Sequence, residues 1–273
     1  MEKRRSPIKK IMLTVVLVII GACTLFPFLW MVLASFKDMA DLLNTSKMFV
    51  FAPTIHNYFD VFTQYDFSRP MFNSLYIGAI STGLALLFGL PAAYSIGRFH
   101  QQVFSSLILL VRIIPAISFL VPWYILFTKL HLTGTYTVLI LSHFLTSLPL
   151  IIWIMIPYFE GLPKELEEAA WIDGCSQTGT FFKIMLPLST PGILTSTLLA
   201  FIFSWNNFMF ALVLSTNETK TIPTAVFAFI SYTNINWSGL MAAAVVITAP
   251  ILLISLCLQK YVVSGLTAGA VKG

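Results

Sequence analysis

The sequence predicts an all-α polytopic membrane protein with six transmembrane helices, on three observations. Of the 273 residues, 58% are hydrophobic and 10% are charged, whereas an ordinary soluble domain is about a quarter charged. The charged residues are unevenly placed and leave uncharged runs longer than the roughly 20 residues that a helix needs to cross a bilayer. The runs are continuous, whereas a β-barrel shows short alternating segments. A water-soluble enzyme and a disordered chain are both excluded by this composition.

The uncharged runs define the predicted spans in order. Five runs contain no charged residue, at 11–36, 70–97, 130–159, 184–217 and 221–259. A sixth run, 103–127, is interrupted by Arg112 alone. Pro91, Pro115, Pro122 and Pro149 lie within these runs, where each removes a backbone hydrogen bond and is expected to kink its helix. We expect spanning helices at about 11–34, 74–96, 103–127, 137–159, 192–214 and 241–259.

The basic residues predict that both termini are cytoplasmic. Residues 1–10 would form a cytoplasmic N-terminus, and inner segments of membrane proteins carry an excess of Lys and Arg. The net charge of +5 therefore reflects topology rather than nucleic-acid binding. In this orientation the inner segments hold Lys3, Arg4, Arg5, Lys9, Lys10, Arg98, Lys164, Lys183, Lys260 and Lys272, and the outer segments hold Lys37, Lys47, Arg69, Lys129 and Lys220.

Small residues recur along one face of the second predicted span. Ala85, Gly89 and Ala93 are four residues apart, and small residues so spaced let helices approach closely in lipid. We expect this face to pack within the chain rather than to form a dimer seam.

The cytoplasmic loop 160–191 differs from the rest of the chain because it is rich in charge. Acidic residues at 165, 167 and 168 follow Pro163 in a predicted first helical turn, where the helix dipole favours carboxylates. Asp173-Gly174 reads as a helix stop, and a second short helix is expected from about Ser176 to Pro187. The loop could lie on lipid headgroups, but its acidic face favours a protein partner.

Spaced residues in this loop resemble a known motif. Glu168-Ala169-Ala170, then Gly174, then Ile184-Met185-Leu186-Pro187 match the EAA motif of ABC importer permeases at each spaced position. Further likenesses run from about residue 50 to the end, including 53–58, 73–75, 187–192 and Ser204-Trp205-Asn206-Asn207-Phe208. The chain therefore resembles the MalG-like permease subunits of carbohydrate ABC importers, which are inner membrane components of binding-protein-dependent transport. Cys175 stands where that family usually has Ala.

The resemblance implies a type I ABC importer permease fold and a coupling role for the loop. A cytoplasmic ABC ATPase dimer would dock on it, and ATP-driven motion would switch the helices between inward- and outward-facing states. A second, unlike permease subunit and an extracytoplasmic sugar-binding protein would complete the assembly in a bacterial cell (inner) membrane. Gly174 would set the turn, and Glu168 would supply a carboxylate at the dock. The implied ATPase-coupling residues are Glu168, Ala169, Ala170, Asp173, Gly174, Ile184, Leu186 and Pro187.

The chain lacks the sequence features of an enzyme. None of its 14 glycines is followed by Lys, so a P-loop of the GxxxxGK[ST] type is absent. ATP and Mg would therefore be held by the partner ATPase, with no cofactor bound by this chain. The four histidines and three cysteines lack metal-site or disulfide spacing, so we predict no metal site and no catalytic residues.

Polar residues inside the predicted spans are candidates for a substrate path. An intramembrane Arg is costly and is a functional candidate by default, although Arg112 could equally be a paired or snorkelling residue. His143, Trp205, Asn206 and Asn207 offer hydroxyl-binding polar groups and an aromatic face, the chemistry that binds sugars. Each could instead hold helices together.

Three function classes remain at this stage. The first is a permease subunit of an ATP-driven importer for sugars or oligosaccharides, with a permease for another solute such as glycerol phosphates as its closest alternative. The second is an ion-driven secondary transporter, which should carry mid-membrane carboxylates; none of the predicted spans contains Asp or Glu. The third, a structural membrane protein, would not need the EAA-like loop.

Overall fold

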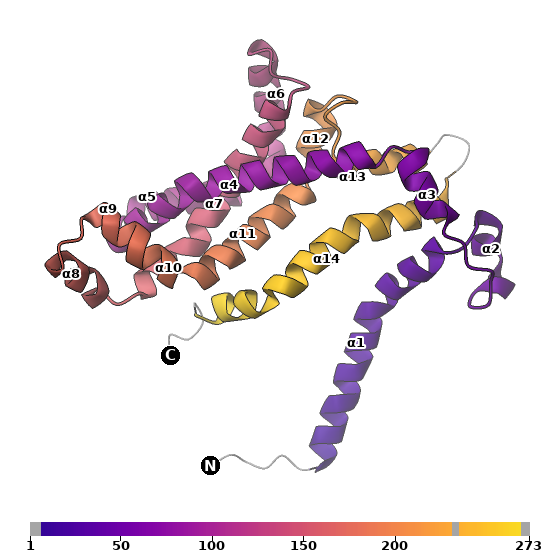
Figure 1. The fold of residues 1–273 in the computed structure, drawn as a ribbon, viewed down its shortest axis with the longest axis horizontal. Helices are drawn as coiled ribbons and strands as arrows, with labels where there is room; N and C mark the ends of the chain where they lie inside the picture. Colours follow the sequence, from indigo (N-terminus) through magenta and orange to yellow (C-terminus); the bar gives the residue numbers. More distant parts are fainter. Residues whose placement is uncertain (1–6, 231–234, 269–273) are drawn as a thin grey trace. The chain divides into compact units, whose positions relative to one another are not determined.

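A computed structural model describes residues 7–230 and 235–268, and Figure 1 shows that part of the chain as a succession of helices. Among the described residues there is one isolated antiparallel bridge, Ile230 with Ile235, and no strand. The all-α fold is thus confirmed. The basic residues Lys3, Arg4, Arg5 and Lys272 lie outside the described residues.

The helices are α1 Pro7–Ser35, α2 Met39–Leu43, α3 His56–Thr63, α4 Ser68–Arg98, α5 Gln102–Ile113, α6 Leu120–Lys129, α7 Tyr136–Gly161, α8 Glu165–Ile172, α9 Gln177–Thr180, α10 Leu186–Leu188, α11 Thr190–Trp205, α12 Met209–Leu214, α13 Ile222–Ala225 and α14 Trp237–Ala268.

Four helices in the described part are long and apolar enough to cross a membrane. They are Ile8–Ser35, Ser68–Arg98, Tyr136–Gly161 and Trp237–Lys260, and they cover the predicted spans 11–34, 74–96, 137–159 and 241–259. Two further pairs of helices pass the same test only when taken together, because each pair is sharply bent. The count therefore reaches six if each bent pair is one span.

The third predicted span, 103–127, is broken rather than continuous. Helix α5 ends at Ile113, and the following helical segment is turned by 89°. Pro115 has no N–H to donate and restricts the residue before it to extended backbone, and Ile114 has φ −67° and ψ 122°. The sequence predicted one helix with a kink at Pro115, whereas the helix in fact ends before this proline.

The fifth predicted span, 192–214, was also wrong as one helix. Helix α11 ends at Trp205, and α12 begins at Met209. Between them the side chain of Asn207 accepts a hydrogen bond from the backbone N–H of Phe210 at 3.2 Å, which satisfies one of the free donors at the start of α12. A second bend, of 77°, separates Gln177–Leu188 from Thr190–Trp205.

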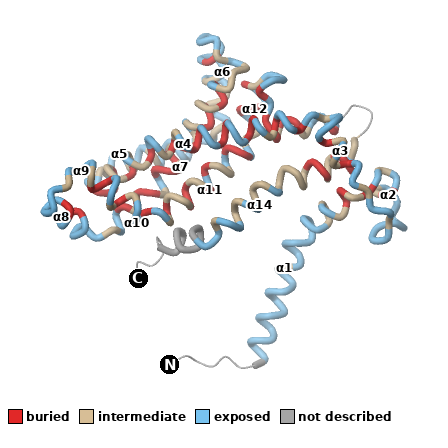
Figure 2. The backbone as a smooth tube through the Cα atoms, in the orientation of Figure 1, coloured by how far each residue is buried: buried red, intermediate tan, exposed pale blue. Residues whose placement is uncertain are grey.

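The chain divides into two compact units: Met1–Phe67 with Val226–Ala249, and Ser68–Ala225 with Pro250–Gly273. In the first unit α1 is exposed along most of its length (Figure 2). Past its end, the buried Nζ of Lys37 donates to the carbonyls of Lys47 and Met48 at 3.0 and 2.6 Å. The Asn57 amide donates to the carbonyls of Ser35 and Lys37 at 2.8 and 2.7 Å, so α3 is tied to the chain that follows α1.

The core of the second unit is the packing of α4 against α7. Ala85 and Ala93 of α4 are fully buried, and a side chain at Gly89 would meet Ile151 at 3.1 Å and Leu148 at 3.4 Å. The small-residue face therefore packs within the chain, as expected. Figure 2 shows the buried positions concentrated along α4, α7 and α11.

A second set of contacts ties the start of α4 to the segment after α12. The buried Asn73 amide donates to the carbonyls of Glu218 and Lys220 at 3.0 and 2.8 Å. The hydroxyl of Tyr136 donates to Asn73 Oδ1 at 2.8 Å, and the backbone N–H of Ile222 donates to Ser74 Oγ at 2.9 Å. Residues 73–75, which resemble the family's early segment, therefore hold the chain after α12 against the start of α4.

Candidate functional site

The loop between α7 and α11 folds as two helical pieces joined by a glycine turn. Glu165, Glu167 and Glu168 occupy the first turn of α8, where their carboxylates face the positive end of the helix dipole. The turn after α8 is made by Gly174 at φ +84°, a left-handed conformation that glycine adopts without steric cost. Ser176 then caps α9, its side chain accepting from the backbone N–H of Gly179 at 3.1 Å.

The two faces of α8 have different surroundings. Glu167 and Ala170 are buried, whereas Glu168, Ala169 and Asp173 are exposed. Ile172 is 87% exposed and Trp171 is 44% exposed, so α8 carries exposed apolar side chains beside its exposed carboxylates. The spacing of Leu162, Leu166, Ala169 and Ala170 predicts one apolar face, but of the two alanines Ala170 is buried and Ala169 is exposed, because successive helical residues lie about 100° apart.

The second half of the loop leads into α11 through an irregular helix. Phe181–Met185 is a π-helix, a form that is rare and frequent at functional sites. Ile184 and Leu186 pack against the core cluster between α4 and α7, whereas Pro187 is exposed. Gly192, just after the bend, is buried, and the Tyr158 ring lies directly against it. The loop therefore leads directly into the first turn of α11, which packs against Tyr158 of α7.

Arg112 lines a cavity of about 440 Å³ between the α5–α6 region and α7. Its guanidinium carbon lies 4.5 Å from the ring centroid of Trp153, a cation–π distance. Among the described residues no carboxylate lies within ion-pair distance of Arg112. The cavity thus presents a positive group that is not neutralised by an acidic side chain.

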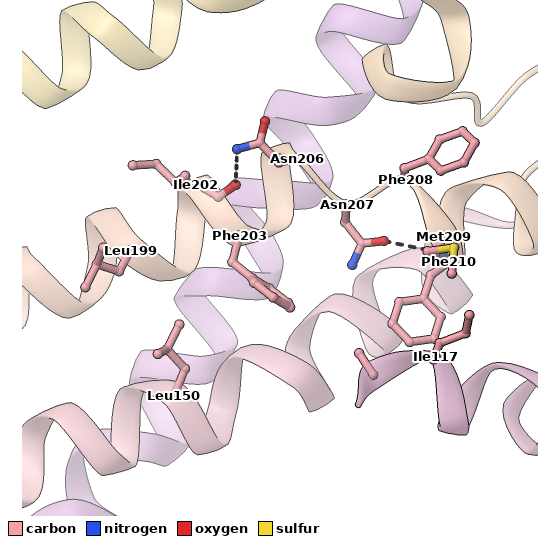
Figure 3. A pocket seen from close by; sticks show the side chains of 11 residues that line it. Ile117, Leu150, Leu199, Ile202, Phe203, Asn206, Asn207, Phe208, Met209 and Phe210 are labelled. Atoms are coloured by element: carbon pink, nitrogen blue, oxygen red, sulfur yellow. Dashed lines mark hydrogen bonds between the residues drawn. The ribbon is translucent and has the colours of Figure 1, made fainter. Parts of the chain in front are cut away.

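Asn206 and Asn207 line a second, open cavity of about 560 Å³ at the break between α11 and α12 (Figure 3). The Asn206 amide donates to the carbonyl of Ile202 at 3.0 Å. Ala116, Leu150 and Phe203 line both cavities, so the two cavities adjoin. The structure therefore brings Arg112 and the two asparagines to one region of the second unit.

His143 and Trp205 lie elsewhere, inside the helix packing. Each is 1% exposed, and neither lines the two cavities. His143 Nδ1 lies 2.7 Å from Ser204 Oγ, which is 3.4 Å from Ser81 Oγ. This chain of polar groups joins α7, α11 and α4, which is the helix-joining arrangement that the sequence left open.

Sequence reasoning missed three residues that join the loop to α4. Arg98 and Glu167 form a buried ion pair, and Tyr94 donates to the same carboxylate. The available signal was a charged residue at the end of a span and an acidic run in the loop, which gave no reason to pair these particular residues. Among the residues the structure describes, no group of three or more His, Cys, Asp or Glu is placed to hold a metal ion.

These features define a class: an all-helical membrane protein with broken spans, adjoining cavities at the breaks and a two-faced loop that leads into one of the helices. The chain belongs to the family of binding-protein-dependent transport system inner membrane components, and the family's sequence model matches residues 85–268.

Relatives and a solved structure agree with this assignment. The chain is 35% identical over 277 residues to the trehalose/maltose transport system permease protein MalG of Thermococcus litoralis, covering 99% of each chain. It is 34% identical to the arabinooligosaccharides transport system permease protein AraQ of Halalkalibacterium halodurans, covering 100% of each. A bacterial ABC transporter that imports the acidic polysaccharide alginate contains a chain of the same fold, with a TM-score of 0.81, 22% identity and coverage of 96% of this chain and 99% of that one.

Proposed function

We propose that this chain is the permease subunit of an ATP-driven importer for sugars or oligosaccharides. Membership of the inner membrane component family supports the transport role. The full-length relatives named for trehalose/maltose and for arabinooligosaccharides support the carbohydrate class. The chain alternates between inward- and outward-facing states, and a separate ATPase binds ATP and Mg.

The observation that carries the coupling role is the two-faced geometry of the loop. Glu168, Ala169 and Ile172 face outward on α8, available to a partner groove. Gly174 allows the chain to reverse, and Ile184 and Leu186 hold the second half against the core. A rigid loop with one side displayed and the other held is suited to a two-state rigid-body transition.

The partners follow from the same role. We assign a cytoplasmic ABC ATPase dimer to the exposed face of α8, and an extracytoplasmic sugar-binding protein to the opposite side of the membrane. A second, unlike permease completes the path. The excess of Lys and Arg on one side supports cytoplasmic termini and a multi-pass position in the bacterial cell (inner) membrane.

The substrate path is assigned to the cavities that hold Arg112, Asn206 and Asn207. Amide groups and an aromatic-backed cation suit hydroxyl-bearing solutes. The path role of His143 and Trp205 is indirect, since both are buried. Arg112 without an acidic neighbour also favours the alternative solute class, anionic compounds such as glycerol phosphates.

The test is reconstitution of the complete complex in liposomes. ATP hydrolysis is measured with the binding protein and, in parallel, neutral disaccharides, arabino-oligosaccharides and glycerol phosphates. Stimulation by a carbohydrate, with uptake of that carbohydrate, is the expected result. Stimulation by a glycerol phosphate and by none of the sugars would overturn the carbohydrate assignment while leaving the transport role.

A further inference from the structure

The cytoplasmic end of α4 holds a buried ion pair with the loop. Arg98 is the last residue of α4, and its Nε lies 2.8 Å from Glu167 Oε1 of α8. The two residues are 8% and 4% exposed. Breaking such a pair from one side leaves a charge in a poorly solvated place, so the two residues are held together strongly.

The remaining groups of Arg98 bind the chain that connects α7 to α8. Its Nη1 donates to the carbonyl of Leu162 at 2.8 Å and to that of Phe159 at 3.3 Å. Its Nη2 donates to the carbonyl of Pro163 at 3.3 Å. A guanidinium has a planar fork of donors, and here the fork joins the end of α4, the end of α7 and the start of the loop.

Tyr94, one turn earlier in α4, reaches both halves of the loop. Its hydroxyl donates to Glu167 Oε1 at 2.8 Å. Its ring lies 5.0 Å from that of Phe181 in the π-helix and 5.5 Å from that of Phe159 in α7, measured between centroids. A single residue of α4 is therefore in contact with α7, α8 and the segment that leads to α11.

The three carboxylates in the first turn of α8 differ in burial. Glu167 is buried against α4, whereas Glu165 and Glu168 are exposed. In the described part of the loop, Glu167 is the buried carboxylate and the others are available to solvent or to a partner. A buried carboxylate inside a charged, exposed loop needs a structural reason, because burial of an unpaired charge is costly.

We propose that Arg98, Glu167 and Tyr94 form a latch that makes the loop move as one body with α4 and α7. This inference rests on the proposed function. Motion of the ATPase then reaches the membrane helices by two routes: from α8 to α4 and α7 through the latch, and from the π-helix to α11 along the continuous chain. These three are positioning residues. Without the latch, α8 would follow the ATPase while α4 and α7 lagged behind it, so ATP would be hydrolysed with little transport.

The test compares Glu167→Gln with Glu160→Gln, the same change at an exposed carboxylate that lies in α7, outside the docking face of α8. In liposomes with the complete complex, the measured quantity is sugar transported per ATP hydrolysed. We expect Glu167→Gln to lower this ratio about tenfold, within the range of coupling between protein sites, and Glu160→Gln to leave it unchanged. Tyr94→Phe keeps the ring and removes one hydrogen bond, so it should lower the ratio by a smaller factor. It decides the question if the Glu167→Gln complex does not assemble.

A distance measurement separates a latch from a general packing role. Spin labels replace the exposed residues Phe99 and Leu166, with the three native cysteines changed to Ser. We expect one narrow distance distribution in the nucleotide-free and ATP-bound complexes, and a broad distribution in ATP when Glu167→Gln is added. A transport ratio equal to that of Glu160→Gln, or an unchanged distance distribution, overturns the latch. Failure of the proposed function would appear differently, as a wild-type complex whose hydrolysis no sugar stimulates.

Discussion

Gly192 provides the sharpest test of how α7 and α11 meet beside the loop. It is buried two residues after the start of α11. A Cβ at this position would lie 2.7 Å from Cγ and Cδ2 of Tyr158 and 2.8 Å from Cδ1. Carbon atoms in contact are normally about 3.5–4.0 Å apart, so the ring and the added methyl group must separate by roughly 1 Å. Cγ is next to the backbone, and the ring cannot give this space by turning.

The expected result for Gly192→Ala is a loss of stability. Overpacking of a formed interface costs about 1–3 kcal/mol, whereas Gly→Ala within a helix contributes about 0.5–1 kcal/mol in the other direction. The control is Gly83→Ala in α4, where a Cβ meets nothing within 4 Å. Since both variants share the helix-propensity gain, Gly192→Ala should be about 1–3 kcal/mol less stable than Gly83→Ala.

The measurement is denaturant unfolding of the purified complex in detergent, followed by tryptophan fluorescence. Equal unfolding free energies for the two variants would refute the close packing of Tyr158 on Gly192. A transport assay of the same proteins reports whether separating α11 from α7 at this point also alters coupling.

Three further changes test other parts of the structure. Gly174→Pro demands a negative φ at a residue that has φ +84°, so membrane insertion by protease protection should be normal and transport should be lost; normal uptake by a well-expressed variant would contradict the coupling role. His143→Leu removes the hydrogen bond to Ser204 in the buried core, and should lower unfolding free energy by about 1–3 kcal/mol while the KM for the solute stays the same; a change in KM with unchanged stability would place His143 in the path. Asn73→Ala removes the amide that donates to the carbonyls of Glu218 and Lys220 and leaves Glu218 only the longer bond from Tyr136 at 3.4 Å. It should speed limited proteolysis at 215–222, whereas an unchanged cleavage rate would show that the loop is held by other contacts.

Hydrophobicity and charge distribution predicted the all-helical membrane fold because they depend on composition along one continuous segment. The same reasoning located α1, α4, α7 and α14, since each helix is a single apolar run bounded by polar residues. It failed at 103–127 and 192–214, where apolar composition continues across a break. Hydrophobicity reports what lipid accepts, and it does not report where the backbone loses a hydrogen bond or gains a side-chain cap, as at Pro115 and Asn207.

The sequence by itself determined the family, the helical class and the position of the loop, because each is written in residues close together along the chain. Tertiary structure alone decided which polar groups face a cavity and which are buried: Arg112 and Asn207 line open space, whereas His143 is enclosed. It also decided that Arg98 meets Glu167, which lies 69 positions later in the sequence. The physical reason is that burial and ion pairing depend on how separate helices pack, and helices far apart in sequence choose their neighbours only in the folded protein.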